Sequence, residues 1–416
     1  MKALSSSLAF GLFLAFACAV PLSGQTRTWR GLELERKWRE AAWHVGPLRL
    51  QPFLVISNAG VDSNIYYSPQ NPVKDFTLTA GPAVNAYLPL GRALVASGYA
   101  SPQYVWYSKT SRERTWNYYY SGALALNLRR LFISGERRYS DARERWNTEI
   151  DVRPRRKEDG WAGVFLLQAT HRVSLEFGWR SARYLYENLE YETFNIRERL
   201  NRRETRWNVL AYYQAGLRSR FFLDFERGEY DFEFAEASAL RDSRSDAVYA
   251  GVEFPPLGRL RGRVRVGWKR LDVLNPEVGD WRGLVGDTQV SLRLARPFVA
   301  RASYTRDVDF SLWYQSAYFI QSRPSAGASF YIMRFARLDY DYSFGRSDYP
   351  APQDAGGGGG EVKRRDDFRI HQAGLYFRLR KNVALGAVVS RWVRDSNLDR
   401  EDDKRYFYGL NLTYDF

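Results

Sequence analysis

Charged side chains recur at every second position in several segments, and this spacing is the first feature that could do chemistry. In the segment 260–271, basic residues alternate with apolar ones. The basic residues are Arg261, Arg263, Arg265 and Lys269, and the apolar ones are Leu260, Val264, Val266 and Trp268. Residues two apart in an extended strand lie on the same face. The spacing therefore predicts a strand with one cationic face and one apolar face.

Such charged faces have two interpretations. If they line a water-filled lumen with basic residues in excess, they would favour anionic solutes. Alternatively, opposite charges on neighbouring strands form ion pairs that hold a wall together. Both interpretations apply to one set of candidate lumen and selectivity residues. These are Arg180, Arg261, Arg263, Arg265, Lys269, Arg293, Arg301, Arg337, Asp339 and Asp341.

A calcium loop is the nearest match to a metal-binding motif, and it is incomplete. Asp395, Asn397 and Asp399 fit the first three ligand positions of such a loop. Arg400 stands where the turn needs glycine, and Tyr406 stands where the last ligand should be glutamate. We therefore expect no metal and no cofactor.

Histidine, the commonest general acid or base, is scarce in this chain. Of the three histidines, His44 precedes the patterned region and His171 falls in an expected tight turn. His371 shares the parity of apolar Leu375 and Phe377, so it should point away from the polar face. The sequence therefore predicts that the protein is not an enzyme.

Strands must position these charged rows, and a period of two continues from about residue 48 to Phe416. Tight turns and longer polar loops alternate along this region. The tight turns are expected at 88–92, 127–130, 169–172, 215–219, 255–259, 294–297, 330–334 and 379–382. The loops are expected at 62–74, 108–114, 140–158, 187–203, 229–245, 271–283, 308–311, 350–365 and 395–403.

These connections separate about 18 strands, with 16 as the alternative, and alternating loop lengths are typical of an outer-membrane barrel. A soluble sandwich or propeller is the rival fold, but no blade-length repeat is present. Aromatic residues make up 16% of the chain, and the mean hydropathy of −0.48 is too low for a bundle of membrane helices. We therefore expect an all-β, antiparallel transmembrane barrel, closed because open edges would leave backbone groups unpaired in lipid.

The N-terminus has the pattern of a secretory signal. Lys2 precedes an apolar run from Leu8 to Val20, and cleavage is expected after Ala19 or Gly24. The single cysteine, Cys18, lies within this segment. The expected organisation is a signal peptide at 1–24, a periplasmic lead-in at 25–47, either helical or irregular, and a barrel at 48–416.

The formal net charge of +15 has two interpretations. It could indicate a polyanionic partner, or a barrel whose lumen and rim face anionic lipopolysaccharide. We favour the second and expect no nucleic-acid partner, because no nucleic-acid-binding motif is present and the chain is expected to be exported.

An aromatic cluster and an aromatic terminus also fit a barrel. Tyrosine and tryptophan gather between residues 104 and 120, which is typical of a lipid-interface girdle, although stacking on sugars is the alternative. Tyr414 and Phe416 at the chain end should act as the signal for the barrel-assembly machinery.

Two stretches resemble a known family of barrels. Gly60–Tyr66 resembles the turn that follows the first strand in the "putative beta-barrel porin 2" family, and the segment from Tyr249 to Arg306 resembles a later part of it. The resemblance implies an outer-membrane location and an association with capsule or exopolysaccharide genes.

We therefore expect a porin-like channel or an outer-membrane component of exopolysaccharide or capsule export, with a charged and net basic lumen. The alternative is a non-conducting structural or surface-binding barrel, and an outer-membrane enzyme is a distant third. The expected partners are outer-membrane lipid and lipopolysaccharide, the barrel-assembly machinery, and an anionic solute or polysaccharide.

Overall fold

The structure is a computed structural model of the 416-residue chain. It describes residues 28–145, 149, 152–191, 194–216, 219–254, 258–313, 316–354 and 360–416. The expected signal peptide and the first residues of the lead-in lie outside this part of the chain.

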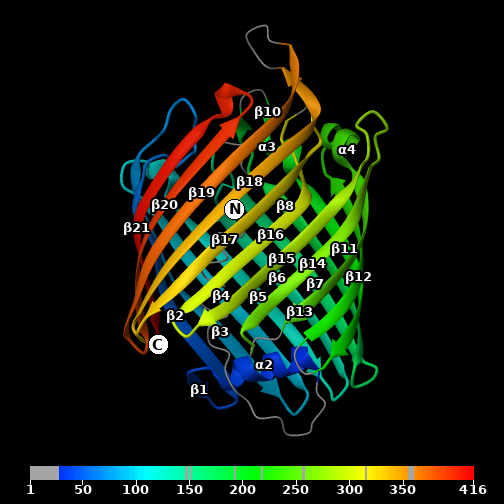
Figure 1. The fold of residues 1–416 in the computed structure, drawn as a ribbon, viewed down its shortest axis with the longest axis vertical. Coiled ribbons are helices and arrows are strands. Elements are labelled where there is room, and N and C mark those ends of the chain that lie inside the picture. Colours follow the sequence, from blue (N-terminus) through cyan, green and yellow to red (C-terminus); the bar gives the residue numbers. More distant parts are fainter. Residues whose placement is uncertain are drawn as a thin grey trace.

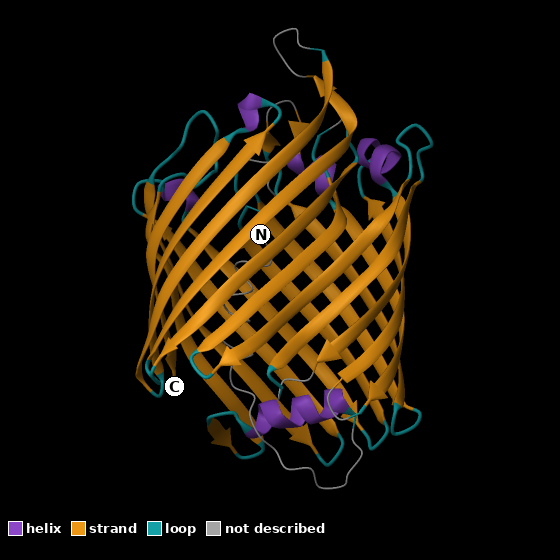
Figure 2. Cartoon of the chain, viewed as in Figure 1, coloured by secondary structure: helices purple, strands orange, loops and turns teal. Residues whose placement is uncertain are grey.

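Eighteen long strands of the described chain form one closed antiparallel barrel (Figures 1 and 2), which confirms the predicted fold and strand number. They are β2 (Leu48–Asp62), β3 (Asp75–Leu90), β4 (Leu94–Tyr107), β5 (Thr115–Asn127), β6 (Leu131–Arg143), β7 (Arg155–Gln168), β8 (Val173–Tyr186), β11 (Arg202–Ala215), β12 (Ser219–Phe232), β13 (Ser243–Phe254), β14 (Leu260–Val273), β15 (Trp281–Ala295), β16 (Phe298–Phe310), β17 (Tyr318–Ile332), β18 (Ala336–Asp354), β19 (Glu361–Arg380), β20 (Val383–Ser396) and β21 (Asp403–Asp415). The barrel closes where β2 pairs with β21, so each of the eighteen long strands pairs with a neighbour on both sides.

Short elements occupy the two ends of the barrel. At the end with the tight turns, the periplasmic end, lie helix α2 (Trp29–Arg39) and strand β1 (Trp43–Val45), which pairs with β2 (Figure 1). At the opposite, external end lie α3 (Ile196–Leu200), α4 (Ala235–Arg241) and the hairpin of β9 (Glu190–Tyr191) and β10 (Phe194–Asn195). The 3₁₀ turns η1 (Ser111–Glu113) and η2 (Asp399–Glu401) lie in two of the long loops. Among the described residues, no helix is long and apolar enough to cross a membrane.

Six of the eight tight turns fall where the sequence predicts them, and the other two, at 215–219 and 255–259, lie partly outside the described residues. Several external loops are shorter than expected. The expected loop at 350–365, for example, is mostly part of β18 and β19, which extend to Asp354 and begin again at Glu361. Above the lipid, the outer face of these strands meets water, so it carries ion pairs such as Arg346–Asp367 at 2.7 Å. Where the outer face of a strand is polar, its sequence no longer alternates between apolar and polar residues. Such a segment is easily predicted as a loop.

The same change of environment reverses the pattern at the external end of β14. Val266 and Trp268 point outward, with half of their surface exposed, toward the space that lipid occupies. Farther along the strand, Arg270 faces outward and pairs with Asp272, while Leu271 is buried inside. The barrel wall therefore continues beyond the membrane, and a cluster of apolar side chains packs inside it around Leu271.

Burial and register place most of the aromatic cluster on the outer face. Tyr104 and Trp116 are neighbours across β4 and β5, with ring centroids 5.2 Å apart, and Tyr118 and Tyr120 continue the row. Tyr119 alternates with them and points inward to Glu144. This arrangement fits the girdle interpretation of the cluster.

Candidate functional site

The strand alternation turns all ten candidate residues toward the lumen, but most are engaged in ion pairs. On β14, Arg265 donates to Glu226 at 3.1 Å and lies 2.7 Å from an oxygen of Asp224, reaching past β13 to β12. Its guanidinium group also stacks on the ring of Tyr249, 3.5 Å from the centroid. Lys269 is almost completely buried and binds Asp307 of β16 at 2.8 Å. These contacts tie β14 to β12, β13 and β16.

A second group of candidates pairs across β16, β17 and β18. Arg301 binds Asp341 at 2.9 Å and also donates to Ser329. Arg337 binds Asp339 on its own strand at 2.9 Å. The interpretation of these charges as wall-stabilising therefore has direct geometric support.

The remaining candidates are less constrained. Arg263 lies 3.6 Å from Glu253, and Arg261 donates to the carbonyl oxygen of Gly258 at 3.2 Å. Arg293 is exposed near the periplasmic turn that joins β15 to β16. Arg180 binds Glu158 at 3.1 Å, yet 47% of its side chain stays exposed to the lumen. These cations can meet a passing solute.

The sequence prediction missed further charged residues that lie beside Arg180. Arg156 and Arg180 share Glu158, at 3.0 and 3.1 Å. On β11, Arg202 and Arg206 share Glu204 in the same way, at 2.9 and 3.1 Å. The two arginine–glutamate–arginine triads fall at the edges of segments predicted as loops. The spacing of Arg202, Glu204 and Arg206 is itself the signal that could have identified them.

The members of these triads other than Glu158 line a cavity of about 340 Å³ inside the barrel. The facing wall consists of side chains from β16 and β17: Thr305, Asp307, Val308, Asp309, Phe310 and Gln321. A volume of this size falls within the ~300–1,000 Å³ typical of small-molecule sites. The lumen thus holds a cavity with arginines on one wall and both polar and apolar side chains on the other.

External loops fold over this space. The connection between β16 and β17 is held from above by Arg241 of α4, which is fully buried. Its guanidinium group donates to the carbonyl oxygens of Ser311 and Trp313 at 3.0 Å each. Glu149, also buried, accepts hydrogen bonds from the Ser311 hydroxyl at 2.6 Å and the Leu312 amide at 2.9 Å. The loop is therefore fixed in an inward position.

The contact between Glu149 and the loop that joins β16 to β17 should depend on pH. Burial raises the pKa of Glu149 to about 7, although its hydrogen bonds to Ser311 and Leu312 and the charge of Arg364 act the other way. Because the pKa of this carboxyl group is raised in the closed loop, the closed loop is most stable when Glu149 is protonated. Its stability therefore falls as the pH rises from the ordinary pKa of a glutamate through 7. Hydrogen exchange at the Leu312 amide, corrected for its intrinsic rate, should therefore be faster at pH 8 than at pH 5. Glu149→Gln should remove the difference, and an unchanged pH dependence in this variant would contradict the assignment.

Helix α2 lies across the periplasmic mouth (Figure 2). The hydroxyl of Thr28 caps the helix by accepting from the Gly31 amide at 3.3 Å. Gly31 packs so closely on the barrel wall that a Cβ there would lie 1.9 Å from Oδ1 of Asn127. Arg30 forms a two-pronged pair with Glu176 of β8, at 2.8 and 2.5 Å. The helix is therefore docked on the barrel interior.

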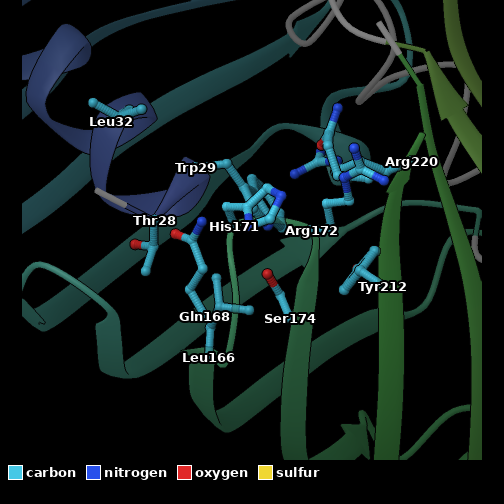
Figure 3. A pocket seen from close by; sticks show the side chains of 11 residues that line it. Thr28, Trp29, Leu32, Leu166, Gln168, His171, Arg172, Ser174, Tyr212 and Arg220 are labelled. Carbon is cyan, nitrogen blue, oxygen red and sulfur yellow. The ribbon is translucent and has the colours of Figure 1, made fainter. Parts of the chain in front are cut away.

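A smaller cavity, about 170 Å³, lies beside this helix (Figure 3). Trp29 and Leu32 of α2 line one side of it, and His171 and Arg172 of the adjacent turn line another. Arg220 stacks on the Trp29 ring, 4.3 Å from its centroid. The periplasmic mouth is thus narrowed by the helix and lined with cations.

The docking of α2 can be tested at Arg30. Arg30→Ala removes both hydrogen bonds to Glu176, a carboxylate that is only 4% exposed. We expect the docking of the helix to weaken by about 1.5–3 kcal/mol, the usual contribution of a hydrogen bond to a charged group. Hydrogen exchange over residues 29–39 measures this. Lys37→Ala is the matched control, because Lys37 pairs with exposed Glu33 and should cost less than about 0.5 kcal/mol. Equal exchange in the two variants would contradict the docking.

Two residues of the incomplete calcium loop, Asp395 and Asn397, and also His371 are engaged with neighbouring side chains and backbone. Asp395 pairs with Arg369, and the side-chain oxygen of Asn397 accepts from the Arg365 amide at 2.7 Å. His371 is on the outer face, where its Nδ1 lies 2.9 Å from the hydroxyl of Tyr340. Within the part of the chain that the structure describes, no three His, Cys, Asp or Glu side chains are grouped as metal ligands would be.

Solved structures similar to this chain are outer-membrane barrels. The outer membrane protein OccK1 (OpdK) of Pseudomonas aeruginosa matches with a TM-score of 0.52 at 9% identity, over 88% of this chain and 98% of that one. Another structure of opdK from the same organism gives a TM-score of 0.51 at 10% identity, with the same coverage. The siderophore receptor PirA of Acinetobacter baumannii gives 0.45 at 8% identity, over 88% and 80% of the two chains. At these identities the likeness concerns the fold alone. No curated protein sequence is similar enough to the chain to count as a relative.

The family comparison is more specific. The model of the family described as "Putative beta-barrel porin 2" matches residues 44–416, which include part of β1 and the entire barrel. The match agrees with the resemblance noted in the sequence, and with the barrel neighbours it places the protein in the cell outer membrane. This chain therefore belongs to the putative beta-barrel porin 2 family.

Proposed function

We propose that this porin-like outer-membrane barrel is a channel that favours anionic solutes, and that in the cell it serves as an outer-membrane component of exopolysaccharide or capsule export. The observation that carries the proposal is the cavity inside the barrel, toward which Arg180 and Arg206 point with 47% and 40% of their side chains exposed. Exposed guanidinium groups in a confined aqueous space attract anions.

Ion selectivity tests the channel directly. The purified barrel should conduct in planar lipid bilayers, and in a KCl gradient its reversal potential should show a preference for chloride. Replacing Arg261 and Arg293 with glutamine removes two lumen charges that form no ion pair within the described part of the chain, so the preference should fall without loss of the fold. A preference for potassium in the parent protein would reject the anion channel.

The role in export has a separate test in the cell. Deleting the gene should reduce the acidic polysaccharide at the cell surface and increase the amount retained in the periplasm. Complementation with the parent gene should restore export. Normal surface polysaccharide in the deletion strain would reject the export role but leave the anion channel standing.

A non-conducting structural or surface-binding barrel is the second candidate. It is favoured by the narrowing of both mouths: α2 docks at the periplasmic end, and the loop held by Arg241 and Glu149 covers the external end. Absence of conductance both in the parent protein and in Arg30→Ala would support this candidate over the channel.

We propose that the protein acts without catalysis. The two histidines that could serve on the barrel are poorly placed, because His171 is in a periplasmic turn and His371 is on the outer face. The proposed partners are lipid and lipopolysaccharide outside the wall, and the barrel-assembly machinery at the strand that ends in Tyr414 and Phe416.

A further inference from the structure

Two arginines of the lumen stand directly opposite each other on adjacent strands. In the register of β8 and β11, Arg180 is the partner of Arg206. Like charges in this position repel and destabilise a sheet. A wall that places two guanidinium groups side by side therefore needs something negative between or beside them.

The neighbouring glutamates satisfy this need only in part. Glu158 binds Arg180 through one terminal nitrogen, and Glu204 binds Arg206 in the same way. Each glutamate is also shared with a second, almost fully buried arginine: Glu158 with Arg156 and Glu204 with Arg202. Both Arg180 and Arg206 form part of the cavity lining, and 47% and 40% of their side chains stay exposed.

The charged side chains that line the cavity favour an anion. Four of them are arginines, Arg156, Arg180, Arg202 and Arg206, and three are carboxylates, Glu204, Asp307 and Asp309. The lining therefore has more basic than acidic side chains, which suits a monoanion such as a carboxylate. Arginine forks bind carboxylates with two parallel hydrogen bonds, which also fixes the orientation of the ligand.

The side chains on the facing wall suit a ligand that presents hydroxyl groups to them rather than a second negative charge. Thr305 and Asp309 are exposed there, and Gln321 is half-buried. Asp309 accepts hydrogen bonds and repels anions, so this wall suits the hydroxyl groups of a ligand better than a second negative charge. A ligand with a carboxylate at one end and hydroxyls at the other would satisfy both walls at once.

We propose that this cavity binds a carboxylate-bearing sugar, a uronate, with its carboxylate between Arg180 and Arg206 and its hydroxyl groups toward Asp309, Thr305 and Gln321. The cavity of about 340 Å³ suits one sugar unit with its water. This inference rests on the proposed function, because it names the chemical class of solute that the channel would take. The same chemistry could come from a free uronic acid or from one unit of an acidic polysaccharide.

Isothermal titration of the purified, detergent-solubilised barrel tests the site without requiring conductance. The probes are sodium glucuronate, glucose, acetate and a tetrasaccharide of glucuronic acid. Glucuronate should bind at least about tenfold more tightly than glucose, because only glucuronate uses the arginine pair, and more tightly than acetate, which lacks hydroxyls. The tetrasaccharide should bind at least as tightly as glucuronate if the solute is a polymer, and more weakly if it is a free sugar.

The variant Arg180→Gln with Arg206→Gln should lose at least about tenfold in glucuronate affinity. It should still fold, because Glu158 and Glu204 keep Arg156 and Arg202 as partners. The matched control, Arg261→Gln with Arg293→Gln, removes the same charge elsewhere in the lumen and should keep its affinity. Heat-modifiable migration on gels reports whether each variant is folded.

Three outcomes would overturn the site: no glucuronate binding, equal binding of acetate and glucuronate, or equal loss of affinity in the two double variants. If the double variant of Arg180 and Arg206 does not fold, the single variants Arg180→Gln and Arg206→Gln must each weaken binding. A barrel that conducts chloride but does not bind glucuronate would reject this inference and keep the channel. A barrel that binds glucuronate but does not conduct would reject the channel and keep the site.

Discussion

Replacing Arg265 with alanine should lower the free energy of unfolding by about 3–5 kcal/mol, because it leaves a buried carboxylate without its partner. Asp224 is only 3% exposed, and Arg265 is the cation that lies 2.7 Å from it. Without the guanidinium group, the carboxylate must stay charged in a poorly hydrated place or take up a proton. Urea unfolding of the barrel reconstituted in lipid vesicles would measure the loss.

The control variants distinguish the loss of an ion pair from the loss of a positive charge in the lumen. Arg261→Ala also removes a lumen cation from β14, but Arg261 is held by a hydrogen bond to the Gly258 carbonyl rather than by a carboxylate, so its loss should cost no more than about 1 kcal/mol. Combining Arg265→Ala with Asp224→Asn should recover part of the stability, because the amide does not carry the buried charge. Equal losses in Arg265→Ala and Arg261→Ala would show that the ion pairs do not stabilise the wall.

On the opposite face of the same strand, Val266→Arg should cost about 2–4 kcal/mol. Val266 faces outward with 50% of its surface exposed, and its cross-strand neighbours are Ala250 and Gly286. Near the middle of the membrane, an arginine there would lose its water and find neither a carboxylate nor a hydrogen-bond acceptor. Val266→Leu is the control and should be nearly neutral, because it keeps the face apolar.

The same vesicle assay would check the assignment of faces. The cost of Val266→Arg should disappear when the protein is unfolded and refolded in detergent micelles that water can penetrate. A cost below about 0.5 kcal/mol in vesicles would mean that this face does not meet lipid, and the parity of β14 would then be wrong.

The barrel, its faces and most of its turns could be predicted from the order of the residues alone. These depend on local properties: side chains two residues apart share a face, and short connections interrupt the alternation at regular intervals. Within the lipid band, each strand of the wall has one apolar and one polar face, so the pattern of β14 is visible without any partner. The alternation of apolar and polar residues no longer predicts the faces where the wall extends above the lipid. There the outer face meets water and loops pack against the inner face, so the alternation is reversed or lost, as at Arg270 and Leu271.

Which charges meet, by contrast, depends on the closed fold. Lys269 binds a carboxylate 38 residues later in the chain, and Arg265 reaches Glu226, 39 residues earlier, past an intervening strand. Such pairs depend on strand register and on how far each side chain extends along the wall, and neither is encoded in the period of two. The same holds for the cavity between Arg180, Arg206 and Asp309, because its two walls come from strands that approach each other only when the barrel closes and its external ends fold inward.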